Sequence, residues 1–216
     1  MKMTCVANNV DKKVISKLKS SWGLSFFVST NGNKILFDTG SNGEELIHNL
    51  ETLEIDPGEI ECIVISHKHR DHAGGLEGIL KLNSKIRVIY PTRGKIYFSK
   101  NLFTSGNIGI CIREQALCID SGGNIILLTG CAHPGIAAMV KKVMKDTGKR
   151  VYGLFGGFHL EYHPAFIINK IIRCLKDLGV EKAGPSHCTG EKAIRLFRSA
   201  FKNNFLEFNL GDKIEL

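Results

Sequence analysis

The segment 66–72, Ser-His-Lys-His-Arg-Asp-His, concentrates side chains that bind metals and transfer protons. With 8 histidines in 216 residues, the pattern H-x-H-x-D-H arises by chance with a probability on the order of 10⁻⁴ to 10⁻³. In an extended segment His67 and His69 point the same way and can bind one metal ion together. Asp71 and His72, after the chain turns, can point at a second position nearby. Because a carboxylate adds a hard oxygen to the imidazoles, the set suits Zn²⁺ best, with Mn²⁺ or Fe²⁺ as alternatives.

Further candidates follow strands that the sequence predicts, where loops build a shared cavity. They are Asp38, His133, His159, His163 and His187. A metal site built on segment 66–72 needs about two more ligands, and His133 and His187 are the favoured candidates for them. His159 is a further functional candidate, whereas His163 and His48 are better interpreted as ordinary packed or surface residues.

Two cysteines adjoin these histidines, Cys131 two residues before His133 and Cys188 directly after His187. A thiolate at either position could bind the metal or act as a redox centre. Free cysteine is also among the most buried residue types, and burial is the favoured interpretation for both.

The composition predicts one globular domain over residues 1–216, with 43% hydrophobic and 23% charged residues. No apolar run is long enough to span a membrane, and the N-terminal segment lacks the apolar stretch of a signal peptide. The seven cysteines include no CxxC pair, which is typical of a reducing compartment. We therefore expect a cytoplasmic protein with no membrane association; the sequence does not indicate its oligomeric state.

The net charge of +8 arises from residues 141–202, which include 13 Lys or Arg residues and 5 Asp or Glu residues. Such a segment could attract an anionic small molecule or nucleic acid. The alternative is that these charges lie on the solvated faces of helices, as the spacing in 165–178 indicates.

The periodicity predicts strands first, then strands that alternate with helices. Strands are expected near 4–8, 24–30, 34–40, 62–66 and 85–91, and again near 115–120, 122–130, 151–157, 184–187 and 205–210. Helices are expected near 42–53, 74–83, 134–146, 165–178 and 191–201, while 93–116 gives no clear pattern. This order predicts an α/β (α+β) fold in which two sheets pack face to face with helices outside.

These motifs resemble the metallo-β-lactamase superfamily. HKHRDH, preceded by LFDTG, carries the resemblance, and GCAHPGI, GGFHL and PSHCTG narrow it to a subgroup that includes an archaeal dihydropterin–aminobenzene phosphate synthase and many uncharacterised hydrolases. The resemblance implies a four-layer αββα sandwich with a dinuclear metal site. It implies that His67, His69 and His133 bind one metal, that Asp71, His72 and His187 bind the other, and that Asp38 orients a ligand.

The chain departs from the family pattern where many members place a metal-bridging Asp as G-D-x-L. Here the residues are Gly157, Phe158, His159 and Leu160. Phe158 cannot bridge two metals, so His159 either replaces the Asp or contacts substrate, and one or two metals are expected. The segment 93–116 is shorter than in larger relatives, which disfavours a pterin-type substrate. His69 stands where oxygen-reducing diiron relatives carry Glu, which disfavours redox diiron chemistry.

The sequence thus predicts a metallohydrolase that uses a metal-activated water on an ester-type or phosphorylated small molecule, with Asp71 and His159 as catalytic residues. Two alternatives remain. The first is a phosphodiesterase or nuclease acting on nucleic acid, although the sequence has no basic patch interleaved with aromatic residues to support it. The second is a non-catalytic metal-binding module.

Overall fold

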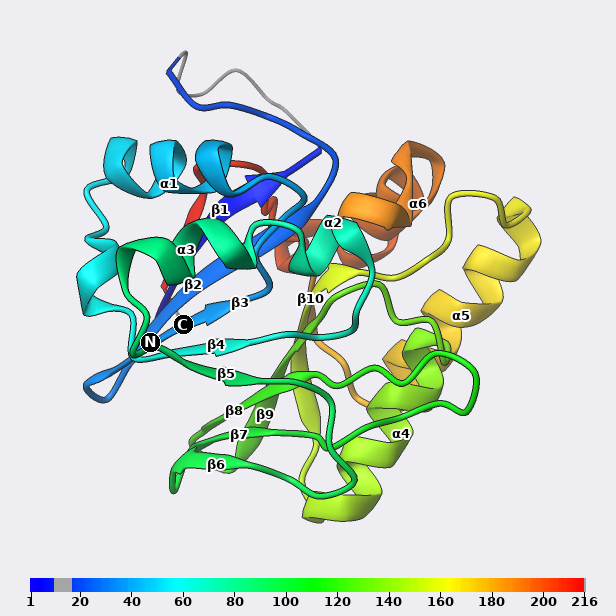
Figure 1. The fold of residues 1–216 in the computed structure, drawn as a ribbon. Helices are drawn as coiled ribbons and strands as arrows, with labels where there is room; N and C mark the ends of the chain where they lie inside the picture. The colour runs from blue at the N-terminus through cyan, green and yellow to red at the C-terminus, as the bar shows by residue number, and fades with distance from the viewer. Residues whose placement is uncertain (10–16, 216) are drawn as a thin grey trace. The chain divides into compact units, whose positions relative to one another are not determined.

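A computed structural model describes residues 1–9 and 17–215. The chain divides into two compact units: unit 1 comprises Met1–Pro91 and Phe208–Leu216, and unit 2 comprises Thr92–Glu207. Each unit contains one six-stranded mixed sheet and its own helices (Figure 1). The single domain predicted over residues 1–216 remains a prediction.

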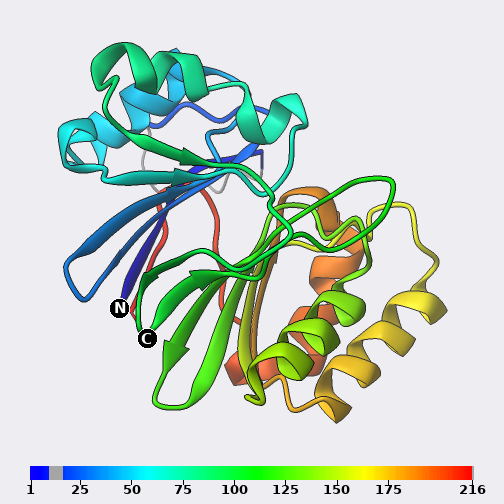
Figure 2. The same ribbon diagram turned by 60° about the horizontal axis from the view of Figure 1, so that its bottom comes forward.

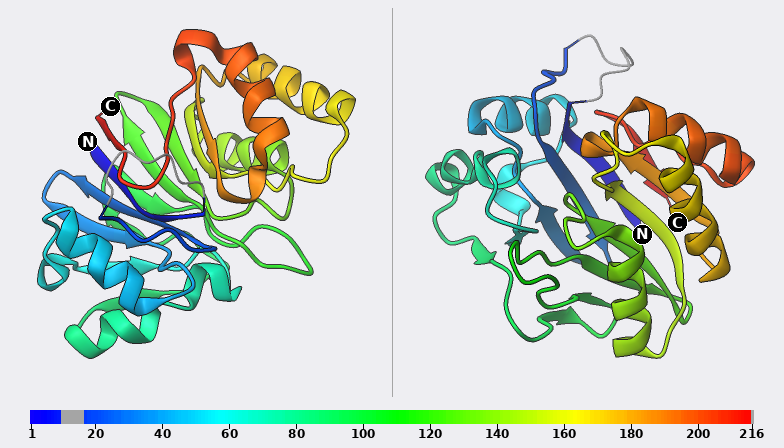
Figure 3. Two further views of the ribbon diagram at one scale, coloured as in Figure 1. Left: turned by 90° about the horizontal axis from the view of Figure 1, so that it is seen from above. Right: turned by 90° about the vertical axis from the view of Figure 1, so that its right-hand side faces the viewer.

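The sheet of unit 1 has the strand order β12-β1-β2-β3-β4-β5. It starts as an antiparallel meander, in which β1 pairs with β2 and β2 with β3. β4 then joins parallel to β3, and β5 parallel to β4. At the other edge β12 pairs antiparallel with β1, so the two ends of the chain lie side by side (Figure 3). The strands are β1 (Lys2–Asn8), β2 (Leu24–Thr30), β3 (Asn33–Phe37), β4 (Cys62–Val64), β5 (Arg87–Ile89) and β12 (Lys213–Glu215).

Two helices of unit 1, α1 (Gly43–Thr52) and α3 (Leu76–Leu82), cover one face of its sheet (Figures 1 and 3). Asn42 caps α1, because its side chain accepts hydrogen bonds from the backbone N–H groups of Glu44 and Glu45. The core beneath the helices is aliphatic. Its buried members include Val6, Leu36, Leu46, Leu50, Ile63 and Ile79.

The sheet of unit 2 has the order β11-β10-β9-β8-β7-β6. β9, β10 and β11 are parallel to one another, whereas β8, β7 and β6 continue the sheet in antiparallel fashion. The strands are β6 (Tyr97–Ser99), β7 (Leu102–Thr104), β8 (Leu117–Ser121), β9 (Asn124–Thr129), β10 (Val151–Gly157) and β11 (Lys182–Ser186).

Three helices of unit 2 cover one face of its sheet (Figure 2). They are α4 (Ile136–Thr147), α5 (Ala165–Asp177) and α6 (Glu191–Phe201). α4 ends at Gly148, whose φ of +68° is the left-handed conformation that glycine adopts easily. Each helix turns an apolar stripe to the sheet, and the core includes Met139, Val143, Ile168, Ile172 and Phe197.

The mixed pairing decides where loops can meet. β3 and β4 end at one edge of the unit 1 sheet, and β9, β10 and β11 end at one edge of the unit 2 sheet. Segments that follow the carboxyl ends of parallel strands are brought together at such edges, where α/β proteins bind their ligands. All the predicted site residues follow one of these strands.

Two segments differ from the sequence-based expectation. Residues 205–210 form no strand: Phe205 makes a single bridge to Ala183, and the last strand is β12 instead. Apolar and polar residues alternate here because some side chains are buried, not because the backbone pairs with a neighbouring strand. Phe208, for example, stacks on Phe26 with ring centroids 4.6 Å apart. The segment 93–116, which gave no clear pattern, contains the short strands β6 and β7.

The cysteines within the described residues are all free thiols. Within the same part of the chain, no helix is both long enough and apolar enough to cross a bilayer.

Candidate metal centre

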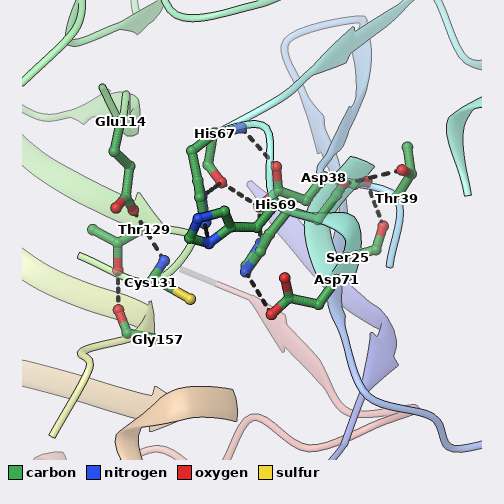
Figure 4. Close-up of polar contacts among 12 residues, drawn as sticks. Ser25, Asp38, Thr39, His67, His69, Asp71, Glu114, Thr129, Cys131 and Gly157 are labelled. Carbon is green, nitrogen blue, oxygen red and sulfur yellow. Dashed lines mark hydrogen bonds and ion pairs between the residues drawn. The ribbon is translucent and has the colours of Figure 1, made fainter. Parts of the chain in front are cut away.

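The ligand candidates of unit 1 lie at the ends of two neighbouring parallel strands. Asp38 directly follows β3, and His67 follows β4, while Asp71 and His72 lie in the one-turn helix α2 (Arg70–Ala73). The backbone of Asp38 has a φ of +60°, a conformation that non-glycine residues adopt at a cost of about 1–3 kcal/mol. The sharp turn directs its carboxylate back over the strand ends, toward the histidines (Figure 4).

Asp38 is fully buried and orients two of the histidines at once (Figure 4). Its Oδ2 accepts a hydrogen bond from Nδ1 of His72 at 2.7 Å and another from the Ser66 hydroxyl at 2.7 Å. Because the single Ser66 hydroxyl proton is given to Asp38, its oxygen accepts from Nδ1 of His67 at 2.9 Å. Both imidazoles therefore direct Nδ1–H at these acceptors and turn Nε2 the other way, where a metal ion would take the place of any proton on Nε2.

The donor atoms of unit 1 converge. Nε2 of His67 lies 3.1 Å from Nδ1 of His69, and Nε2 of His72 lies 3.4 Å from Oδ2 of Asp71. Burial lowers the pKa of the His72 imidazole, but the carboxylates of Asp38 and Asp71 outweigh burial and raise that pKa to about 10. The site therefore has a strongly negative potential, which favours a bound cation.

Two contacts in unit 1 hold Asp71 and His72 in place. The indole N–H of Trp22 donates to Oδ2 of Asp71 at 3.1 Å, and Trp22 is itself about half exposed. The backbone N–H and the hydroxyl of Thr39 both donate to the carbonyl of His72, at 2.7 and 3.0 Å. This approach requires the glycine that follows the motif, because a Cβ on Gly75 would lie 2.1 Å from the carbonyl oxygen of Thr39.

The candidates of unit 2 lie in the loops that follow β9, β10 and β11. Ala132, His159 and His187 each take up the left-handed conformation, with φ of +58°, +53° and +52°. Three neighbouring strands thus turn sharply just where the predicted ligands lie. Such a concentration of strained backbone is typical of a functional site.

A buried carboxylate that the sequence did not single out holds the first of these loops. Glu114 is fully buried, and its two oxygens accept hydrogen bonds from the backbone N–H groups of Cys131, Ala132 and His133, at 2.8–2.9 Å (Figure 4). Charge-assisted bonds of this kind are stronger than neutral ones. Glu114 therefore positions His133 by fixing its backbone.

The loop after β10 is fixed from both sides. The Thr129 hydroxyl donates to the carbonyl of Gly157 at 2.9 Å (Figure 4), and the Thr189 hydroxyl accepts from the Phe158 N–H at 3.0 Å. Phe158 is buried against Phe197, with ring centroids 5.3 Å apart. Its side chain is part of the helix core.

Within unit 2 the structure brings His133 and His159 together, with ring centroids 4.5 Å apart. His187 is buried at the start of the loop after β11. Next to it, the pKa of the Cys188 thiol is held well below its usual range by a hydrogen bond with Cys131, against burial, with His159 and His187 adding to the effect. His163 lines a cavity of about 190 Å³ together with His133 and His159.

His48 lies elsewhere, on α1, where its Nε2 contacts the carbonyl of Lys17 at 2.8 Å. The predicted ligands His67, His69, Asp71 and His72 thus form one cluster within unit 1, next to Asp38, and His133 and His159 form a pair within unit 2. The donors are imidazole and carboxylate, with tautomers already set, and they fit a divalent metal such as zinc. The identity of the metal and the number bound remain predictions.

Comparison with known proteins identifies the class. The family model of the metallo-β-lactamase superfamily matches residues 23–106, and a relative that is 31% identical matches 91% of this chain and 90% of its own length. The chain therefore belongs to the metallo-β-lactamase superfamily. That relative is the 7,8-dihydropterin-6-methyl-4-(β-D-ribofuranosyl)-aminobenzene-5′-phosphate synthase of Methanocaldococcus jannaschii.

A solved structure confirms the predicted fold class. Tm1679, described as a metal-dependent hydrolase of the β-lactamase superfamily, matches all of this chain and 99% of its own, with a TM-score of 0.82 and 24% identity. A shorter similarity, 35% identity over 58% of this chain and 47% of the relative, is to the exodeoxyribonuclease WalJ of Streptococcus pneumoniae.

Proposed function

We propose that this protein is a metal-dependent hydrolase that acts on a phosphorylated or ester-type small molecule. The observation that carries the proposal is the cluster of His67, His69, Asp71 and His72, in which Asp38 sets the tautomers of two imidazoles. Buried carboxylate–histidine pairs of this kind raise the basicity of a metal ligand and fix its direction. A structural role alone does not require four ligating groups with their donor atoms turned toward one another.

The ligand assignment follows the family. His67, His69 and His133 would bind one ion, and Asp71, His72 and His187 the other, with zinc as the first choice. One or two divalent ions held there would supply Lewis-acid activation of water near neutral pH. We infer that Asp71 would also accept a proton from the attacking water, and that His159, exposed beside His133, would stabilise negative charge that develops on the substrate.

A cavity in unit 1 next to Asp71 is large enough to hold part of a small substrate. Its volume is about 450 Å³, and it is lined by Ser21, Trp22, Ser41, Asn42, Glu45, Arg70 and Asp71. Arg70 can bind a phosphate or carboxylate, and Trp22 offers an exposed ring for stacking. Glu45 favours a substrate that also carries a hydrogen-bond donor. The phosphate and aromatic ring in the name of the archaeal synthase's product are consistent with this set of contacts.

A nuclease activity is the second candidate, favoured by the similarity to the WalJ exodeoxyribonuclease and by the basic residues of segment 141–202. The two functions differ in how strongly the salt concentration affects substrate binding. Binding to a nucleic acid falls steeply with salt because counterions are released from the phosphate backbone, whereas a small substrate shows a weak dependence.

The test is hydrolysis by protein reconstituted with Zn²⁺ or Mn²⁺, measured on aryl phosphate monoesters and diesters, lactones, thioesters and single-stranded DNA. We expect turnover of at least one small ester, and a loss of about 100-fold or more in His67→Ala and Asp71→Ala. His48→Ala, outside the cluster, should keep full activity. Full turnover in His67→Ala would refute the site, and salt-sensitive degradation of DNA without small-ester turnover would favour the nuclease.

A further inference from the structure

The loop after β10 lacks the carboxylate that many members of the superfamily use to bridge two metals. Phe158 stands in its place, and the buried packing of Phe158 against Phe197 excludes it from the ligand set. A metal in this part of unit 2 therefore needs an anionic ligand from another residue. Two thiols lie near His159, those of Cys131 and Cys188, and it is Cys131 whose sulfur forms a group of potential metal donors with His133 and His159.

Cys131 lies within reach of two imidazoles of its own unit. Its Sγ and one nitrogen each of His133 and His159 all lie within 4.8 Å of one another. Burial decreases along the set: Cys131 is buried, His133 is half-buried and His159 is exposed. The three donors therefore leave their outer side open, as a metal that also binds an external ligand requires.

The position of Cys131 is fixed by features that ordinary packing does not explain. Glu114 accepts a hydrogen bond from the Cys131 N–H at 2.9 Å. On the adjacent strand, Gly157 provides the space: a Cβ there would lie 3.2 Å from Cα of Cys131 and 2.7 Å from Sγ of Cys188. Because Gly157 has no side chain, the backbone of Cys131 and the thiol of Cys188 can both lie close to β10.

Other buried cysteines show what a purely structural cysteine looks like in this protein. Cys118 lies in the middle of β8 and is part of the apolar core of unit 2. Burial raises the pKa of its thiol far above the usual range, which keeps it neutral and a poor ligand. Cys131 differs in that it lies at a strand end with two imidazoles beside it.

We propose that Cys131, His133 and His159 together bind a thiophilic divalent cation, with the Cys131 thiolate in place of the absent bridging carboxylate. Soft thiolate with imidazole favours zinc, and equally its spectroscopic substitutes cobalt and cadmium. The bond forms between Sγ and the cation, and the thiol proton leaves to solvent. The proposal rests on the proposed function only in sharing His133 and His159 with the predicted centre.

The test is titration of metal-free protein with Co²⁺, followed by absorption in the near ultraviolet, where a thiolate bound to cobalt gives an intense charge-transfer band. We expect the band in the wild type, its loss in Cys131→Ser, and its retention in Cys188→Ser, the matched control with a neighbouring buried thiol. His159→Ala should keep the band but bind Co²⁺ about tenfold more weakly or worse. A band of wild-type strength in Cys131→Ser, or its loss only in Cys188→Ser, would overturn the proposal.

A second measurement needs no variant. X-ray absorption at the zinc edge of the zinc-loaded wild type should show a sulfur ligand at about 2.3 Å; a coordination shell of nitrogen and oxygen alone would contradict the proposal. The readouts also separate the two proposals. A cobalt–thiolate band in a protein without hydrolytic activity would remove the proposed function alone, and metal-dependent hydrolysis without the band would remove this inference alone.

Discussion

At the scale of single residues, one carboxylate has the largest influence on unit 1. Asp38 directs His72 by a direct hydrogen bond and His67 through the Ser66 hydroxyl. Asp38→Asn preserves the shape but removes the charge, and an amide cannot accept from both partners in the same way. We expect zinc affinity to fall by about 10–100-fold, measured by competition with a chromophoric chelator.

The matched control is Asp120→Asn. Asp120 is a carboxylate at the end of β8, paired with Lys149 and distant in the fold from any predicted ligand of its unit. The zinc affinity of the Asp120→Asn variant should stay at the wild-type value. Equal affinities for wild type and Asp38→Asn would show that Asp38 does not orient the ligands.

Sequence reasoning found the residues that bear the chemistry and, through the family resemblance, the orienting residue Asp38, but it missed Glu114 and Trp22. His67, His69, Asp71 and His72 are recognisable because their spacing in the chain is itself the signal. Glu114 and Trp22 act on residues 17–19 and 49 positions away, through contacts that only the fold creates. Neither residue belongs to a sequence motif that would mark it as functional. Glu114 falls in the segment 93–116, which has little periodicity, and Trp22 lies just before a strand, where many residue types occur.

At the scale of elements, the parallel edges of the two sheets explain why ligands distant in sequence gather. The order of strands and helices could be predicted because its periodicity is strong in β2, β9, α4 and α5. The strand expected at 205–210 was wrong because alternating burial does not require a ladder: Phe208 and Leu210 are buried by side-chain packing while the backbone pairs only at Phe205.

The loop between β9 and α4 provides a test at this scale. Glu114→Gln leaves one neutral acceptor oxygen for the backbone N–H groups of residues 131–133, so buried donors lose partners. We expect the free energy of unfolding of the metal-free protein to fall by about 1–3 kcal/mol, measured by urea denaturation, with weaker zinc binding as well.

Glu181→Gln serves as the control, because the Glu181 carboxylate is half exposed and pairs with Arg150 at 2.8 Å. An exposed ion pair contributes about 0–1 kcal/mol. Indistinguishable effects of the two substitutions would mean that Glu114 does not hold the loop.

At the scale of the whole molecule, a metal that binds only the folded chain must stabilise it. At a free zinc concentration 100 times the dissociation constant, the gain is about 2.7 kcal/mol, which raises the midpoint of thermal unfolding by several degrees in a chain of this size. Calorimetry of chelator-treated protein before and after addition of Zn²⁺ measures it. An unchanged midpoint at saturating zinc would be evidence against binding at a built site.

The metal content of the purified protein tests most directly whether the predicted histidines and Asp71 bind metal ions. Elemental analysis of protein purified without added metal should give about two equivalents per chain, falling toward one in His187→Ala and staying at two in His48→Ala. No bound metal in the wild type, even after reconstitution with zinc, manganese or iron, would contradict the account.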